Sequence, residues 1–288
     1  MMNQIKTVSL LGLLSGLLVA IGYLLGGSGG ALIGLVMAGG MNFFSWFSSD
    51  KIALAAYGAQ PVSRAEAPQL YAMVEKLAQK ADLPMPAVYI IPTAGANAFA
   101  TGRDPQHAAV AVTQGILQML PADELEGVIA HELSHIKNRD TLTQAVAATV
   151  AGAISYLAQM LQFGMMFGGY GGRDDREGSN AISALATIIL APLAATVIQM
   201  AISRTREFEA DASAARITGK PRALANALRR LDAAARQMPM ATNPAFEPLL
   251  IMNAVPKQTF SNLFSTHPST EARVENLLNV ERELVGQR

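Results

Sequence analysis

The longest stretch without charged side chains restricts most strongly what this chain can fold into. No Asp, Glu, Lys, Arg or His occurs from Thr7 to Ser49, and two apolar runs, about 5–25 and 31–47, lie on either side of Gly26–Gly30. A helix needs about 20 apolar residues to cross roughly 30 Å of hydrocarbon. The stretch therefore predicts two transmembrane helices with a very short turn. A cleaved signal peptide is the alternative for the first run, but no Ala-x-Ala-like cleavage site follows it.

A second pair of apolar runs lies in the middle of the chain. Charges are absent on both sides of the polar segment Arg173–Glu177, and the flanking runs extend over about Thr143–Phe167 and Ala181–Ile202. These runs predict a second transmembrane hairpin, with its second helix kinked at Pro192. A pair of buried core helices is the alternative, because Ala, Gly and Gln dilute both runs.

The basic residues indicate which side of the membrane the polar segments occupy. With the N-terminus inside, residues 48–140 and 204–288 share one side. That side carries the basic residues Lys6, Lys51, Arg64, Lys137, Arg139, Arg204, Arg206, Arg216, Lys220 and Arg222 near the membrane, and the other side carries Arg173 and Arg176. The positive-inside rule assigns the larger group to the cytoplasm. We therefore expect a mainly α membrane protein with about four transmembrane helices, in hairpins 1–47 and 141–203, and a cytoplasmic α+β domain built from 48–140 and 204–288.

The composition excludes several functional classes. Charged residues make up 15% of the chain, against about 25% in soluble proteins. Lys+Arg and Asp+Glu both number 22, so no basic surplus favours nucleic acid as a partner. The chain has no Cys, which excludes disulfides, thiolate metal sites and cysteine nucleophiles. Any metal must therefore be bound by His and carboxylate side chains.

Short-range patterns predict the elements of the polar segments. Residues 66–81 have helical periodicity and precede Asp82-Leu83-Pro84. Three short segments rich in small or β-favouring residues predict a small sheet: Val88–Ile91, Ala98–Thr101 and Ala108–Thr113. Pro121 opens a further helix, and the chain after Arg204 reads as mostly helical.

The helix after Pro121 contains the pattern His131-Glu132-Leu133-Ser134-His135. Residues four apart lie one helical turn from each other, so both imidazoles can face one metal ion while Glu132 stands near a metal-bound water. This spacing is typical of zincin-like metalloproteases, in which the carboxylate is the general base. A helix with two unrelated surface histidines is the alternative.

A catalytic zinc ion needs a third protein ligand and an open fourth position. Glu207 and Asp211 follow the predicted fourth span at a spacing of four residues. One helix face could thus present Glu207 to the metal and Asp211 to a ligand histidine. Glu209 is the alternative ligand, and a solvated charged helix end is the alternative to both.

At this point the sequence resembles the HtpX family of membrane zinc metalloproteases, which are related to the Ste24 prenyl-protein proteases. The resemblance covers the first hairpin, Asn97-Ala98-Phe99-Ala100-Thr101-Gly102, His131–His135, Glu207-x-x-x-Asp211, and Thr266-His267-Pro268 followed by Arg273. These motifs occur in the family's order over most of the chain.

The resemblance implies roles for particular residues. It implies one Zn²⁺ per chain bound by His131, His135 and Glu207, with Glu132 as the general base. It suggests that the segment carrying Asn97, Ala98, Phe99 and Ala100 binds an extended substrate by strand addition, the alternative being an internal strand pair. His267 and Arg273 resemble candidates for stabilising the oxyanion or orienting the third ligand. Alternatively, His267 caps a turn and Arg273 pairs with Glu271 or Glu275.

His107 matches no ligand of the family, and we interpret it as a loop residue. Asp140 either restrains the end of the active-site helix or is a solvated helix-terminal carboxylate.

The expected function is hydrolysis of peptide bonds in misfolded or damaged membrane proteins at the cytoplasmic face of a bacterial inner membrane, as part of stress-related quality control. The expected partners are such substrates, the lipid bilayer and other membrane quality-control proteases. Ste24-like processing of prenylated chains, a non-enzymatic scaffold with a closed zinc site, and a transporter are the alternatives. The transporter is disfavoured because the predicted spans contain no charged residue.

Overall fold

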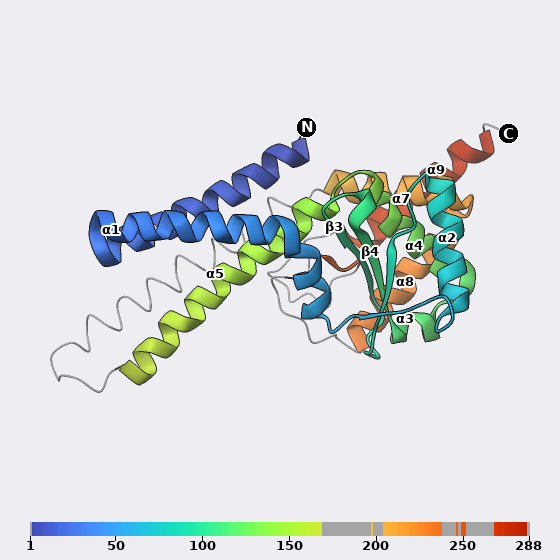
Figure 1. Ribbon diagram of the computed structural model, residues 1–288. Helices are drawn as coiled ribbons and strands as arrows, with labels where there is room; N and C mark the ends of the chain where they lie inside the picture. The colour runs from blue at the N-terminus through green and yellow to red at the C-terminus, as the bar shows by residue number, and fades with distance from the viewer. Residues whose placement is uncertain are drawn as a thin grey trace.

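The computed structural model describes residues 2–168, 197, 204–237, 246, 249–251 and 268–286. Two long helices, α1 (Met2–Ala56) and α5 (Thr141–Gly168), extend to one side of a part that contains a small sheet and shorter helices (Figure 1). The expectation of a mainly helical chain with a small sheet is therefore confirmed.

Helix α1 doubles back on itself at Gly26 and Gly27. Gly27 has a φ of 59°, in the left-handed region that glycine enters without steric cost. The two arms, Ile5–Tyr23 and Gly26–Ala56, are each long and apolar enough to cross a membrane. The chain thus forms a helical hairpin with a short glycine turn, and its second arm continues to Ala56, past the predicted end at Phe47.

Glycines let the two arms of α1 approach closely. A Cβ atom on Gly22 would collide with the carbonyl oxygen of Gly30, and one on Gly34 would collide with that of Leu18. Small residues at such crossings allow backbone contact between membrane helices. Asn42 adds a polar link, because its Nδ2 donates to Ser15 Oγ over 2.8 Å.

Helix α5 packs along α1 (Figure 1). The hydroxyl oxygens of Thr7 and Thr143 lie 3.0 Å apart at a buried contact. The predicted third apolar run is therefore a helix packed on the hairpin. The predicted fourth run, Ala181–Ile202, lies outside the described residues except for the buried Val197. The four-span topology stays a prediction.

The sheet has four strands in the order β1-β2-β4-β3. They are β1 (Gln60–Pro61), β2 (Ala87–Ile91), β3 (Ala98–Gly102) and β4 (Ala108–Thr113). Strand β4 pairs with β2 in parallel and with β3 antiparallel, so β3 forms one edge of the sheet. The three predicted strands are confirmed, and the two-residue β1 is too short to leave a sequence pattern.

The two faces of the sheet bury different sets of side chains. Alternate residues such as Ala98, Ala100 and Val110 belong to the core shared with the shorter helices. The residues between them, such as Phe99 and Ala111, belong to a second cluster formed with α1 and α5. Because neighbouring side chains of a strand point to opposite faces, the sheet separates the two apolar clusters.

Three of the shorter helices pack against α4. The α-helices are α2 (Pro68–Ala81), α3 (Gln114–Met119), α4 (Ala122–Lys137), α7 (Arg204–Thr218), α8 (Pro221–Gln237) and α9 (Thr270–Gly286), and Pro105–His107 form a 3₁₀ turn. Helix α4 packs against α2, α7, α8 and the sheet. It is therefore buried on most of its circumference, unlike a surface helix with one apolar stripe.

Helix α2 begins two residues after the predicted start at Glu66. The Glu66 carboxylate accepts hydrogen bonds from the backbone N–H and the hydroxyl of Ser63 at 2.7 and 2.6 Å. These bonds form a local turn, and Pro68 then opens the helix because its missing N–H costs nothing in the first turn.

The close approach in α1 predicts a difference between two glycine substitutions. Gly34→Ala forces a Cβ atom against the Leu18 carbonyl group, whereas a Cβ on Gly39 meets nothing within 4 Å. Overpacking of this kind costs about 1–3 kcal/mol. We expect Gly34→Ala to lower the midpoint of thermal unfolding in detergent, followed by Trp46 fluorescence, and Gly39→Ala to leave it unchanged or raise it. Equal midpoints for the two variants would contradict the hairpin packing.

Candidate active site

Helix α4 places two imidazoles and a carboxylate in the interior. His131, Glu132 and His135 are 1%, 2% and 5% exposed, and the Nε2 atoms of the two histidines lie 3.1 Å apart. The predicted arrangement of two imidazoles on adjacent turns is therefore what the structure contains. The alternative of two unrelated surface histidines is wrong.

Helix α7 brings a second carboxylate to the histidines. Glu207 Oε1 lies 3.5 Å from His135 Nε2, and Glu207 Oε2 lies 3.8 Å from His131 Nε2. One donor atom from each of the three residues lies within 4.8 Å of the others, so the group can hold a metal ion. Glu209, the alternative ligand, is exposed on the same helix and lies outside this group.

Each histidine is held on its other ring nitrogen by a buried carboxylate. His131 Nδ1 lies 2.9 Å from Asp211 Oδ1, and His135 Nδ1 lies 3.1 Å from Asp140 Oδ2. Such contacts fix the tautomer, because Nδ1–H donates to the carboxylate and Nε2 keeps its lone pair. Both Nε2 atoms can therefore act as metal ligands.

A guanidinium group lies behind each of these carboxylates. Arg273 donates from Nε and Nη2 to Asp211 over 2.8 and 2.7 Å, and from Nη1 to the carbonyl oxygen of Ile251 over 3.0 Å. Arg206 donates from Nη1 to Asp140 over 3.0 Å. All three guanidinium nitrogens of the buried Arg273 thus have partners on other segments. The alternative prediction was that Arg273 pairs with Glu271 or Glu275 on its own helix.

Burial and charge act in opposite directions on the two histidines. Burial, helped by the charge of Arg273, lowers the pKa of His131 to about 4 against the effect of Asp211. Burial also opposes protonation of His135, but Asp140 and Glu207 outweigh it and raise its pKa to about 9. In the metal-free protein a proton on His135 therefore offsets the negative charge of Glu207. A divalent cation would satisfy the same converging acceptors.

Glu132 faces away from water, next to the edge of the sheet. Burial raises the pKa of its carboxyl to about 8, although His135 and a backbone hydrogen bond from Ala100 act in the opposite direction. A raised pKa makes the ionised carboxylate a stronger proton acceptor than an exposed one.

The segment Asn97–Ala100 has one backbone edge toward β4 and one toward α4. The carbonyl oxygen of Asn97 accepts from Thr113 N over 3.0 Å, on the β4 side. On the other edge, Ala98 O accepts from the backbone N–H of Ile251 over 3.0 Å, and Ala100 bonds Glu132. The side chain of Phe99 packs with Tyr57 in the apolar cluster formed with α1 and α5, at a ring-centroid distance of 5.2 Å.

The three remaining sequence hypotheses, on His267, Asp140 and His107, have different outcomes. His267 lies outside the described residues. Asp140 is fully buried beside His135, so the alternative of a solvated carboxylate is wrong. No local pattern reveals this burial, because it depends on Arg206, which is distant in sequence. His107 ends the 3₁₀ turn Pro105–His107 between β3 and β4 instead of lying in a loop, and its Nδ1 lies 2.7 Å from Asp104 Oδ1.

Comparison with known proteins decides the family. Residues 64–281 match the model of peptidase family M48. Over 283 residues the chain is 65% identical to a protein named Protease HtpX homolog from Trichormus variabilis, with 98% of each chain covered. The chain belongs to the HtpX proteases of family M48. An HtpX homologue from Pyrococcus furiosus is 52% identical over 281 residues, covering 97% of this chain and 96% of the relative.

Membership of family M48 makes the chain a metallopeptidase, with the His-Glu group as its candidate metal centre. The crystal structure of S. mikatae Ste24p superposes with a TM-score of 0.53 at 18% identity, covering 96% of this chain. The chain spans 65% of the length of that protein. At this identity the likeness concerns the fold alone.

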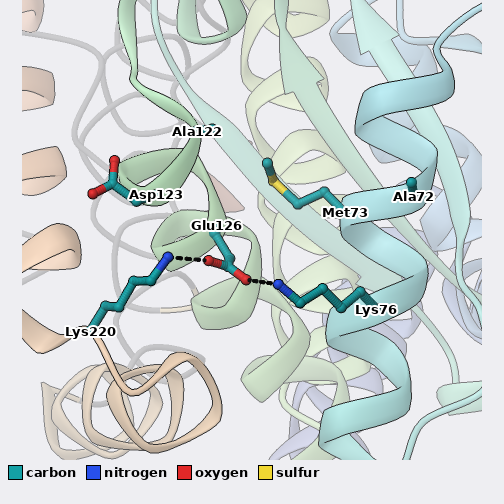
Figure 2. Close-up of a pocket in the computed structure, with 7 residues that line it drawn as sticks. All are labelled: Ala72, Met73, Lys76, Ala122, Asp123, Glu126 and Lys220. Carbon is teal, nitrogen blue, oxygen red and sulfur yellow. Dashed lines mark hydrogen bonds and ion pairs between the residues drawn. The ribbon is translucent and has the colours of Figure 1, made fainter.

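A surface depression of about 510 Å³ lies apart from the metal group of this M48 protein. Figure 2 shows the buried Glu126 of α4 between Lys76 and Lys220, with each ammonium group 3.0 Å from one carboxylate oxygen. Both ammonium groups that line the depression are thus paired with Glu126. The ion pairs connect α4 to α2 and to the segment before α8, which indicates a structural role.

The ion pairs of Glu126 predict that the stability difference between the wild type and the variant Glu126→Gln depends on pH. Burial raises the pKa of Glu126, but hydrogen bonds from Lys220 and Lys76 outweigh it and leave the pKa below 4.5. The stabilisation is therefore complete above pH 4.5 and is lost as the pH falls through the lowered pKa. We expect Glu126→Gln to lower the thermal midpoint at pH 7 by about 2–4 °C. The difference should disappear in acid, and one that persists there would contradict this assignment.

Proposed function

We propose that the chain is a zinc endopeptidase whose metal ligands are His131, His135 and Glu207. The convergence of these three buried side chains carries the proposal. Two neutral imidazoles and one carboxylate are a donor set typical of catalytic zinc sites, which keep a fourth position open. Zinc bound there would polarise the scissile carbonyl group and lower the pKa of water.

In this proposal Glu132 moves the proton. Its carboxylate takes a proton from the attacking water and delivers it to the nitrogen of the leaving amine. Burial and the raised pKa of Glu132 support this role. Asp211 holds the His131 ring in its ligand tautomer, and Arg273 holds Asp211. Arg273 Nη1 also lies 3.8 Å from Glu207 Oε2, where it balances negative charge.

We further propose that substrates bind as an added strand along β3. On the edge of β3 that faces α4, Ala100 bonds Glu132 and Ala98 O accepts from Ile251 N–H. Backbone pairing at such an edge gives affinity with little sequence selectivity. The Ile251 N–H group already uses Ala98 O as an acceptor, which supports the capacity of this edge to bind backbone donors. A substrate that pairs at Ala98 would replace this contact.

The cellular setting follows from the charge distribution. We place the active site on the cytoplasmic side of a bacterial inner membrane, in a multi-pass chain with two hairpins. The basic residues around the polar segments support this orientation. A site directly beside membrane helices can reach loops of membrane proteins and unfolded chains, so we propose misfolded membrane proteins as substrates and a role in stress-related quality control.

Cleavage of unfolded casein by the detergent-purified, zinc-loaded full chain tests the enzymatic proposal. We expect Glu132→Gln to retain zinc, measured by elemental analysis, and to lose cleavage by at least about 100-fold, because general base catalysis contributes 10²–10⁴-fold. Ser134, whose hydroxyl donates to the Ala130 carbonyl oxygen at 2.8 Å, offers a matched control on the same helix. Ser134→Ala should keep both zinc and activity, and cleavage retained by Glu132→Gln would overturn the mechanism.

Removal of the third ligand tests the metal assignment. Glu207→Ala should lose zinc as well as activity, because two imidazoles alone leave the site incomplete. Glu209→Ala is the control on the same helix and should bind zinc as the wild type does. Full zinc occupancy in Glu207→Ala would refute the ligand set.

A further inference from the structure

The buried carboxylate of Asp140 lies between a proposed metal ligand and a guanidinium group. Its Oδ2 atom lies 3.1 Å from His135 Nδ1, and its Oδ1 atom accepts from Arg206 Nη1 over 3.0 Å. Asp140 is 0% exposed, and the Arg206 side chain is 13% exposed. A buried carboxylate needs such partners, since desolvation of an uncompensated charge is costly.

Asp140 and Arg206 each lie at or directly before the start of a helix. Asp140 is the last residue before α5, and Arg206 lies in the first turn of α7, directly before Glu207. The ion pair therefore joins the start of an apolar helix to the start of the helix that carries Glu207. Lys6 on α1 lies within electrostatic range of both residues.

The backbone on both sides of Asp140 is also fixed. Its N–H group donates to the His135 carbonyl oxygen over 3.0 Å, and its carbonyl oxygen accepts from Gln144 N over 3.1 Å. The first bond ends α4 and the second opens α5. A shift of α5 would thus move the Asp140 carboxylate together with the imidazole that it contacts.

We propose that the Asp140–Arg206 ion pair is a positioning device that sets the separation of His135 and Glu207, and with it the zinc affinity. The proposal rests on the ligand assignment of the preceding section. Asp140 directs His135 Nε2 toward Glu207 Oε1, which lies 3.5 Å away, and Arg206 holds both Asp140 and the first turn of α7. His131 has the matching arrangement with Asp211 and Arg273.

Zinc affinity of the full chain in detergent, measured by competition with a chromophoric chelator, tests this role. Loss of a carboxylate behind a ligand histidine lowers metal affinity by about 10–100-fold. We expect that loss in Asp140→Asn, because the new amide presents its NH₂ group either to His135 Nδ1–H or to Arg206. Arg206→Gln should weaken binding by about 10-fold, and Arg206→Lys should restore part of it.

The double variant separates positioning from independent effects. If the two residues act as one device, Asp140→Asn with Arg206→Gln should bind zinc no more weakly than Asp140→Asn alone. Additive losses would overturn the coupling. The visible spectrum of the Co²⁺-substituted protein should also change in Asp140→Asn, because the geometry of the His135 ligand changes.

A matched control lies on α4, the helix that carries His135. Glu126→Gln removes a buried, ion-paired carboxylate that does not touch the metal group, so it should lower stability without changing zinc affinity. Wild-type affinity in Asp140→Asn, with a lowered thermal midpoint only, would overturn the proposal and leave a purely structural role. Zinc binding that survives Glu207→Ala would instead refute the proposed function.

Discussion

Two imidazoles on adjacent turns of α4 bring their Nε2 atoms within 3.1 Å of each other. Two lone pairs at this distance repel unless a proton or a cation lies between them. The surrounding structure maintains this arrangement. Carboxylates hold the Nδ1 atoms, guanidinium groups hold the carboxylates, and α7 adds Glu207 to the same point. The site is therefore a set of converging buried acceptors between which a proton or a metal cation can lie.

The sequence predicted the elements whose chemistry is local. His131, Glu132 and His135 occur within five residues, so helical geometry alone places them together. The first hairpin followed from an absence of charge, and three strands followed from short apolar runs between Gly and Pro. Glu207 and Asp211 needed the family resemblance to stand out from an ordinary charged helix start.

The remaining features depend on contacts between distant segments. Asp140 looks like a solvated helix end until Arg206 from α7 is placed beside it. Arg273 could pair within its own helix by spacing, but the fold buries it against Asp211. The position of β3 at a sheet edge depends on the order of the strands, and single-sequence patterns do not carry this order.

The sheet buries apolar side chains on both of its faces. Ile91, Phe99, Ala109 and Ala111 face the cluster that contains residues of α1 and α5, while their strand neighbours face the core around α4. A truncated protein without the two apolar helices would expose this face to water and tend to aggregate. The peptidase part is thus not a soluble unit attached to a removable anchor, and a water-soluble version would require polar replacements on the far side of its own sheet.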